Sequence, residues 1–113
     1  MDAEETVRAY YDALDAEAYE RLTELLAPEF AQRRPDRALV GRDAFVRFMR
    51  EERPVADATH ELSTLYRTDG PDEYDELAAR GTVRSPGGDS LVEFVDVFTL
   101  EDGTIQKLET YTR

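Results

Sequence analysis

One alternating segment near the C-terminus constrains this chain more than any other. Its apolar positions are Val92, Phe94, Phe98 and Leu100, and Asp96 stands at its centre. Alternation of period two places all five side chains on one face of a β-strand, and that face is expected to lie against the core. Burying a charged group without a partner is costly. Asp96 is therefore either balanced by a partner or is the working group of a pocket.

The length and the composition limit the classes of protein that this chain can belong to. Its 113 residues fit a single small domain over residues 1–113. It has no cysteine and one histidine, which excludes disulfides and thiol catalysis and leaves little for a metal site, so no metal or other cofactor is expected. Neither a secretory signal nor a membrane-spanning apolar run is visible, and we expect a soluble cytoplasmic protein.

The charge balance excludes further partners. Acidic residues outnumber basic residues by 26 to 14, which gives a formal net charge of −12. Such a surface repels nucleic acids and anionic membranes, so neither is expected as a partner. Lys107 is the only lysine. An acidic surplus with so little lysine favours a halophilic protein, because salt screens the self-repulsion; the alternative is the codon bias of a GC-rich genome.

Helical periodicity covers the first half of the chain, and strand-like alternation covers the second half. Helices are predicted over 3–14, from the capping residue Asp15 to Pro28, and from Gly41 to a stop before Pro54. Strands are predicted over 30–34, 59–68, 74–84, the segment after 85–88, and 105–112, with turns at 69–72 and 102–103. Three helices followed by a strand meander predict an α+β domain with the helices on one sheet face.

Three segments resemble a known family in their order and spacing. They are VRAYYDALDAEAYERLTELLAPEF at 7–30, GRDAFVRFM at 41–49, and the terminal VDVFTLEDGTIQKLETYTR. Together they resemble the nuclear-transport-factor-2-like superfamily, in its branch of ketosteroid isomerases and SnoaL-like polyketide cyclases. The resemblance implies the cystatin-like fold, a cone-shaped, curved antiparallel sheet with the three helices on its concave face. It also implies a pocket for a small hydrophobic molecule and a homodimer through the outer sheet face.

The resemblance also assigns residues to roles. Ketosteroid isomerases use a tyrosine and a protonated aspartic acid as an oxyanion hole and a second aspartate as general base. Tyr10 matches the tyrosine, although the neighbouring Tyr11 could equally point inward, and Asp96 matches the protonated acid. Arg34 stands where the base belongs. Because arginine keeps its proton in proteins, isomerisation by that mechanism is not expected.

Strand parity turns Gln32 and Arg34 toward the core if Phe30 faces it, so that Arg34 can lie across the cavity from Asp96. Three interpretations remain open. The guanidinium forms a structural ion pair with Asp96, or Asp96 stays unpaired with a raised pKa and acts as an acid. In the third, Arg34 and Gln32 hold an anionic or carbonyl-bearing ligand.

The remaining candidates complete the predicted site. His60 is a candidate base, but its place at the start of a strand favours a solvated rim position. The ligand is expected to contact Arg34, Gln32, Phe45, Phe48, Met49, Phe94 and Phe98. Leu91, Val95 and Val97 alternate with the cavity face and are consistent with a covered outer face.

Two functions agree with these observations. The favoured one is a non-catalytic domain that binds a small molecule or dimerises. The alternative is a cofactor-free isomerase, cyclase or hydrolase acting on a small hydrophobic carbonyl compound, with Asp96, Tyr10 and His60 as its catalytic residues.

Overall fold

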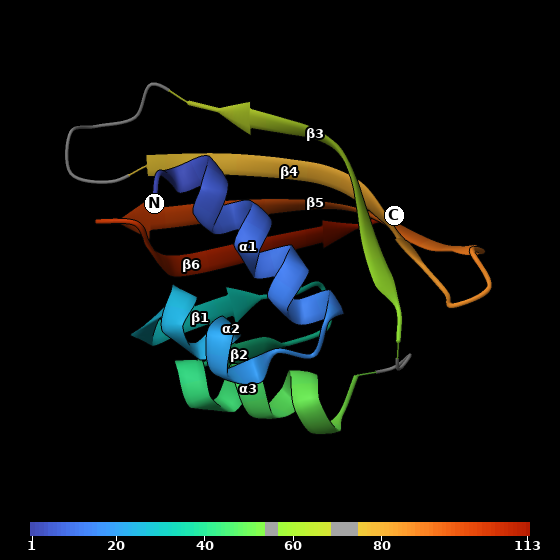
Figure 1. Cartoon of the computed structure of the whole chain (residues 1–113), viewed down its shortest axis with the longest axis horizontal. Helices are drawn as coiled ribbons and strands as arrows, with labels where there is room; N and C mark the ends of the chain where they lie inside the picture. The colour runs from blue at the N-terminus through green and yellow to red at the C-terminus, as the bar shows by residue number, and fades with distance from the viewer. Residues whose placement is uncertain (54–56, 69–74) are drawn as a thin grey trace.

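The computed structural model of the chain describes residues 1–53, 57–68 and 75–113. Three helices lie on one side of a six-stranded sheet (Figure 1). The helices are α1 (Ala3–Asp15), α2 (Tyr19–Leu25) and α3 (Arg42–Glu51). The strands are β1 (Leu26–Arg33), β2 (Ala38–Val40), β3 (Thr59–Arg67), β4 (Asp75–Arg84), β5 (Ser90–Glu101) and β6 (Thr104–Thr112). The predicted α+β class, with helices packed on one sheet face, is confirmed.

The sheet brings the first strand of the chain beside the last. Its strand order is β2-β1-β6-β5-β4-β3, so the four later strands form a meander and β1 joins its edge. The meander is antiparallel, as predicted, and so is the β1–β2 pair. The β1–β6 pair is parallel. The sheet is therefore mixed, and α3 stands in the chain between β2 at one edge of the sheet and β3 at the opposite edge (Figure 1).

The predicted boundaries are wrong around the second helix. Asp15 does not cap it: Asp15 ends α1, and α2 begins at Tyr19 after Ala18. Leu26 and Pro28 belong to β1, which is longer than predicted. Proline fits there because the β1–β6 register is interrupted between Leu26 and Ala31, where no ladder N–H is required. The short strand β2 was not predicted.

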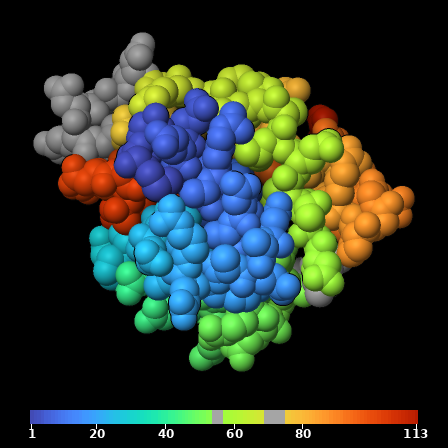
Figure 2. All heavy atoms as spheres, in the orientation of Figure 1, coloured from blue at the N-terminus to red at the C-terminus, as the bar shows by residue number. Residues whose placement is uncertain are grey.

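Aromatic side chains join the helices to the sheet. The rings of Phe30 on β1 and Phe45 on α3 lie 4.9 Å apart between centroids, and those of Tyr10 on α1 and Phe98 on β5 lie 5.2 Å apart. All four side chains are almost fully buried. The space-filling view shows α1 and α2 covering the middle of this face (Figure 2). The core therefore sits between α1, α3 and the concave face of the sheet.

The predicted turns at 85–88 and 102–103 are present. The turn predicted at 69–72 lies outside the described residues. Among the residues that the structure describes, no helix is long and apolar enough to cross a membrane.

Gly81 marks a close approach between three strands. A Cβ built on Gly81 of β4 would overlap the carbonyl oxygen of Glu61 on β3 and lie 2.9 Å from the Phe94 ring on β5. The β3–β4 register also shifts between Leu62 and Thr64, beside this point. Only glycine lets the bent β3 approach β4 this closely.

We predict that Gly81→Ala lowers the free energy of unfolding by about 1–3 kcal/mol, because the methyl group forces backbone and ring apart. Urea denaturation of both proteins measures the difference. Gly87→Ala is the control, since a Cβ there would meet only Ser85 Oγ at an ordinary 3.8 Å. Equal losses for the two variants would contradict the packing argument.

Candidate functional site

A cavity of about 240 Å³ lies between the helices and the concave sheet face. Most of its wall is apolar, and a few polar side chains converge on it, as in many small-molecule sites. Its apolar lining includes Leu14, Phe48, Met49, Ala58, Val83, Leu91, Val92 and Phe94. Its polar lining consists of Tyr10, Gln32, Arg34, Arg53, His60, Asp96, Thr110 and Thr112.

Asp96 is held by two hydroxyl groups. Tyr11 on α1 donates to its Oδ2, and Thr110 on β6 donates to its Oδ1, each at 2.6 Å. These distances are typical of hydroxyl donors on a carboxylate. The side chain is 6% exposed in a wall whose exposed surface is mainly apolar. Both carboxylate oxygens thus already have a protein donor.

A third side chain extends this network. Gln32 on β1 donates from Nε2 to Thr110 Oγ1 at 2.9 Å. Because Thr110 has one hydroxyl proton and gives it to Asp96, it must accept from Gln32, which fixes the orientation of the amide. Gln32 Oε1 is buried without a hydrogen-bond partner. The network therefore links β1, β6, β5 and α1 through their side chains.

Burial governs the ionisation of these groups. Burial raises the pKa of Asp96, and the hydroxyl donors Thr110 and Tyr11, together with the nearby guanidinium of Arg34, offset part of that rise. The pKa values of Tyr10 and Tyr11 are raised by burial first and by the Asp96 charge second. Both tyrosines therefore remain protonated donors.

The structure separates two properties of the neighbouring tyrosines, contact with Asp96 and a place in the cavity wall. Tyr11, rather than Tyr10, donates to Asp96, and both side chains are buried. Tyr10 packs edge-on against Tyr11 and lines the cavity, with no protein partner for its hydroxyl among the described residues. Tyr10 and Asp96 both line the cavity, so their joint action on one ligand oxygen stays a prediction, while the tyrosine hydroxyl that donates to the carboxylate is that of Tyr11.

Arg34 does not pair with Asp96, which removes the predicted structural bridge. Its Nε lies 3.6 Å from Asp36 Oδ1, and its guanidinium lies 5.5 Å from the centre of the Phe48 ring. Arg37 lies over the same ring at 5.1 Å. Arg34 and Phe48 still line the cavity. A guanidinium at the wall is held by Asp36 and by the aromatic face instead of by the buried acid.

His60 is not on a solvated rim, contrary to the prediction. Its Nδ1 lies 2.6 Å from Asp15 Oδ1, and its backbone N–H donates to Asp15 Oδ2 at 2.9 Å. The imidazole packs edge-to-face on Phe94 and is 14% exposed. Asp15, at the end of α1, therefore contacts both the ring and the backbone of His60, the second residue of β3.

The predicted ligand contacts divide into two groups. Gln32, Arg34, Phe48, Met49 and Phe94 line the cavity. Phe45 and Phe98 do not: they are fully buried in the aromatic core, because they pack against Phe30 and Tyr10. Leu91, expected on the outer sheet face, contributes to the cavity wall.

Three residues at the site were missed by the sequence analysis. Thr110 has the parity of the buried Leu108 on β6, a signal that was available. Asp15 was interpreted as a helix cap. Arg53 donates to the carbonyls of Leu14 and Ala58 at 3.3 and 3.2 Å and so ties α1 to the start of β3; no local pattern marks it.

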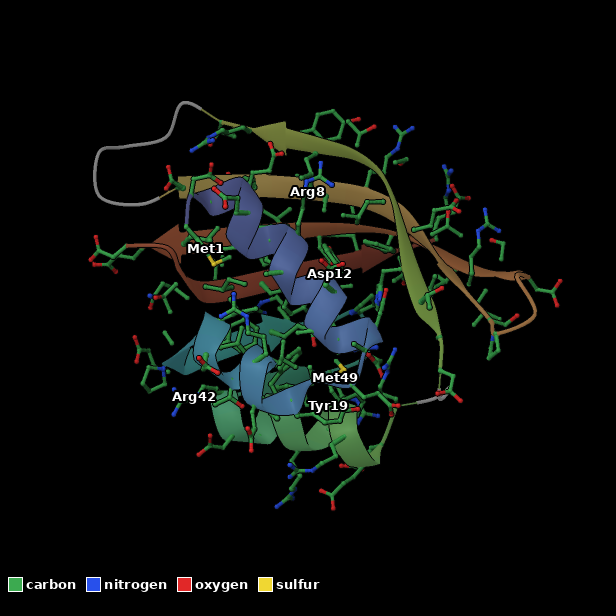
Figure 3. All side chains as sticks on the ribbon, viewed as in Figure 1. Met1, Arg8, Asp12, Tyr19, Arg42 and Met49 are labelled. Atoms are coloured by element: carbon green, nitrogen blue, oxygen red, sulfur yellow. The ribbon has the colours of Figure 1, made fainter. Side chains whose placement is uncertain are left out.

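Figure 3 shows how α2 and α3 close the same side of the molecule. Tyr19 and Met49 lie next to each other there, and the Tyr19 hydroxyl donates to the Met49 carbonyl at 3.2 Å. Among the described residues, no group of three or more histidine, cysteine, aspartate or glutamate side chains is placed to hold a metal ion.

The comparisons with known proteins agree with this fold. The model of the SnoaL-like domain family matches residues 7–108. The chain therefore belongs to the SnoaL-like domain family, within the nuclear-transport-factor-2-like superfamily that the sequence resembled. A comparison with curated protein sequences gave no significant match.

Three solved structures illustrate the range of similar proteins. A candidate polyketide cyclase from Sinorhizobium meliloti has 23% identity and a TM-score of 0.76, with 95% of this chain and 94% of that chain covered. A candidate ketosteroid isomerase from Kribbella flavida has 27% identity and a TM-score of 0.67, with 96% and 75% covered. An Anabaena orange carotenoid protein that binds canthaxanthin has 24% identity and a TM-score of 0.82, with 97% and 35% covered.

We predict that Tyr11→Phe lowers the free energy of unfolding by about 1.5–3 kcal/mol at pH 7, because Asp96 loses a hydrogen bond to its charged form. The raised pKa of Asp96 means that its favourable contribution is complete below its unfolded pKa of 3.8 and is lost as pH rises through the folded value. Removing Tyr11 raises that folded value further. The deficit of the variant should therefore shrink when the pH is lowered to 4.

Urea denaturation at both pH values measures this effect, with Tyr10→Phe as the matched control. Tyr10 is equally buried but does not donate to Asp96. A deficit that is the same for the two variants, or that grows on acidification, would contradict the assignment.

Proposed function

We propose that this SnoaL-like domain binds a small, mainly apolar molecule in the cavity between its helices and its sheet, without converting it. The observation that carries the proposal is that each carboxylate oxygen of Asp96 already accepts a hydrogen bond, one from Tyr11 and one from Thr110, at 2.6 Å each. An acid with both oxygens occupied supports the cavity wall and does not need a ligand to complete it. The canthaxanthin bound by a similarly folded protein supports an apolar occupant.

The chemistry of the wall supports a ligand with one polar end. Leu14, Met49 and Phe94 supply apolar surface, while the Tyr10 hydroxyl offers a hydrogen-bond donor. A carbonyl or ether oxygen on a hydrophobic frame matches this combination. Arg34 at the same wall offers a second donor for such an oxygen.

We predict that 1-indanone, a bicyclic ketone, binds in the cavity with a dissociation constant in the millimolar range or tighter. Titration followed by ¹⁵N–¹H NMR shifts measures the constant and locates the site. Val83→Phe should weaken binding about tenfold or more, because Val83 lines the cavity and the ring fills it.

Thr82→Phe is the matched control, since the adjacent residue of β4 points to the opposite face. It should leave the dissociation constant within about twofold. Absence of binding by the unmodified protein, or equal effects of the two substitutions, would contradict the proposed ligand site.

We also propose that the outer sheet face joins two copies of the chain. Tyr66 and Tyr111 are 47% and 50% exposed, and the cross-strand register places Val95 beside Tyr111 and Val97 in the row of Tyr66. These apolar side chains point away from the helices. A stable dimer buries about 800 Å² on each partner, and this face supplies its apolar centre.

We predict a dimer at micromolar concentration that Val97→Lys converts to a monomer, because a buried like-charged pair would replace the apolar contact. Sedimentation velocity measures the oligomeric state. Glu101→Lys, at the exposed end of the same strand, is the control and should remain dimeric. A wild-type monomer throughout the concentration series would contradict the proposal.

A further inference from the structure

The charges that line the ligand cavity have the opposite balance to those of the whole chain, whose formal net charge is −12. Two arginines, Arg34 and Arg53, and one aspartate, Asp96, line the cavity. His60, which also lines it, contacts the carboxylate of Asp15. The arginine charges therefore outnumber the aspartate charge whether or not Asp96 is ionised. Such a lining favours an anionic ligand group over a cationic one.

The two arginines differ in how their donors are used. Arg53 donates from its two terminal nitrogens to the carbonyl oxygens of Leu14 and Ala58, at 3.3 and 3.2 Å. The Arg34 side chain donates no hydrogen bond to any residue that the structure describes, and its Nε is buried without a partner. The carboxylate of Asp36 lies 3.6 Å from that Nε, which is beyond hydrogen-bond distance. Arg34 is therefore the cavity arginine whose guanidinium can still donate to a ligand.

The ring of Phe48 positions this guanidinium. The guanidinium carbon of Arg34 lies 5.5 Å from the ring centroid and that of Arg37 lies 5.1 Å from it, distances typical of cation–π contacts. Asp36 Oδ2 lies 3.2 Å from Arg37 Nε, so one carboxylate serves both guanidinium groups. One positive charge beside the cavity is left without a counter-charge. An anionic group on the ligand would supply it.

Arg34 also lies where the cavity meets a second hollow. This hollow, of about 350 Å³, shares Arg34, Thr110 and Thr112 with the ligand cavity. Its lining includes the exposed side chains of Arg33 and Tyr111, so it lies at the surface of the domain. A charged group that binds Arg34 therefore lies close to solvent and keeps part of its hydration, which lowers the cost of burying it.

We propose that the ligand of this cavity is a small hydrophobic carboxylate, with its apolar part against Met49 and Phe94 and its carboxylate paired with Arg34. The planar guanidinium can donate two parallel hydrogen bonds to the two oxygens of a carboxylate, whereas a ketone offers one oxygen. The inference rests on the proposed ligand site and specifies the polar end of its occupant. No covalent bond is made or broken, in agreement with a domain that does not convert its ligand.

Three ligands of similar size test the charge preference. They are 3-phenylpropanoate, 4-phenylbutan-2-one, in which a methyl group replaces one carboxylate oxygen, and 3-phenylpropylammonium. ¹⁵N–¹H NMR titration at pH 7 in about 0.15 M salt measures the dissociation constants, because charges separated by more than about 8 Å are then largely screened. The carboxylate should bind about tenfold or more tightly than the ketone, and the ammonium should bind more weakly than the ketone.

Two matched variants test the assignment to Arg34. Arg34→Gln and Arg37→Gln each remove one positive charge beside Phe48 and Asp36, but only Arg34 lines the cavity. The measured quantity is the ratio of the ketone to the carboxylate dissociation constant, which general damage to the cavity would leave unchanged. Arg34→Gln should lower this ratio about tenfold, and Arg37→Gln should change it by less than about threefold. Arg34→Lys, which keeps the charge without the planar fork, should lower it by a smaller factor than Arg34→Gln.

Four outcomes would overturn the inference. If the ketone or the ammonium bound as tightly as the carboxylate, or if the carboxylate failed to bind while 1-indanone bound, the anion preference would be wrong and the binding function would stand. Equal changes of the ratio in Arg34→Gln and Arg37→Gln would overturn the assignment to Arg34. Absence of binding by all of these ligands, 1-indanone included, would overturn the proposed function together with the inference.

Discussion

The fold depends on how it accommodates one carboxylate in an apolar wall. Asp96 on β5 receives a hydroxyl from α1 and another from β6, so a single charged side chain joins a helix to two strands. Leaving it unpaired there would cost several kcal/mol, on the order of a large part of the stability of a small domain. The rotation of α1 about its axis is thereby fixed, because Tyr11 must reach the carboxylate while Tyr10 packs on Phe98.

Much of the fold was predictable because the signals are local. The alternation around Asp96 identified the buried face of β5, and the helices preceded the strands as expected. The partner Thr110 was not predictable by counting from the hairpin turn. Leu100 pairs with Ile105, and continuing that register would place Glu109 opposite Asp96. A β-bulge adds one residue to β6, so a threonine replaces what would have been a second carboxylate.

The other wrong predictions at the site concern the partners of Asp15 and Arg34, for which local contacts and contacts between distant parts of the chain compete. Asp15 is of a residue type that commonly caps helices, yet its carboxylate contacts the ring of His60, 45 residues later in the chain. Arg34 has the strand parity to reach Asp96, yet its guanidinium lies beside Asp36, two residues away, and over the ring of Phe48. Parity predicts which wall a side chain joins, whereas the partner depends on the packing of the whole domain.

The two faces of β5 separate what substitutions can affect. Even-numbered side chains from Phe94 to Leu100 point to the helices, and the odd-numbered Val95 and Val97 point to the opposite side. A substitution that alters the ligand cavity and a substitution that alters the outer surface can therefore be adjacent in sequence, and their side chains do not contact each other. In related sequences, the even-numbered and the odd-numbered positions of this strand should vary independently of each other. The side chains of the two sets lie in different environments, one in the core and one on the outer face.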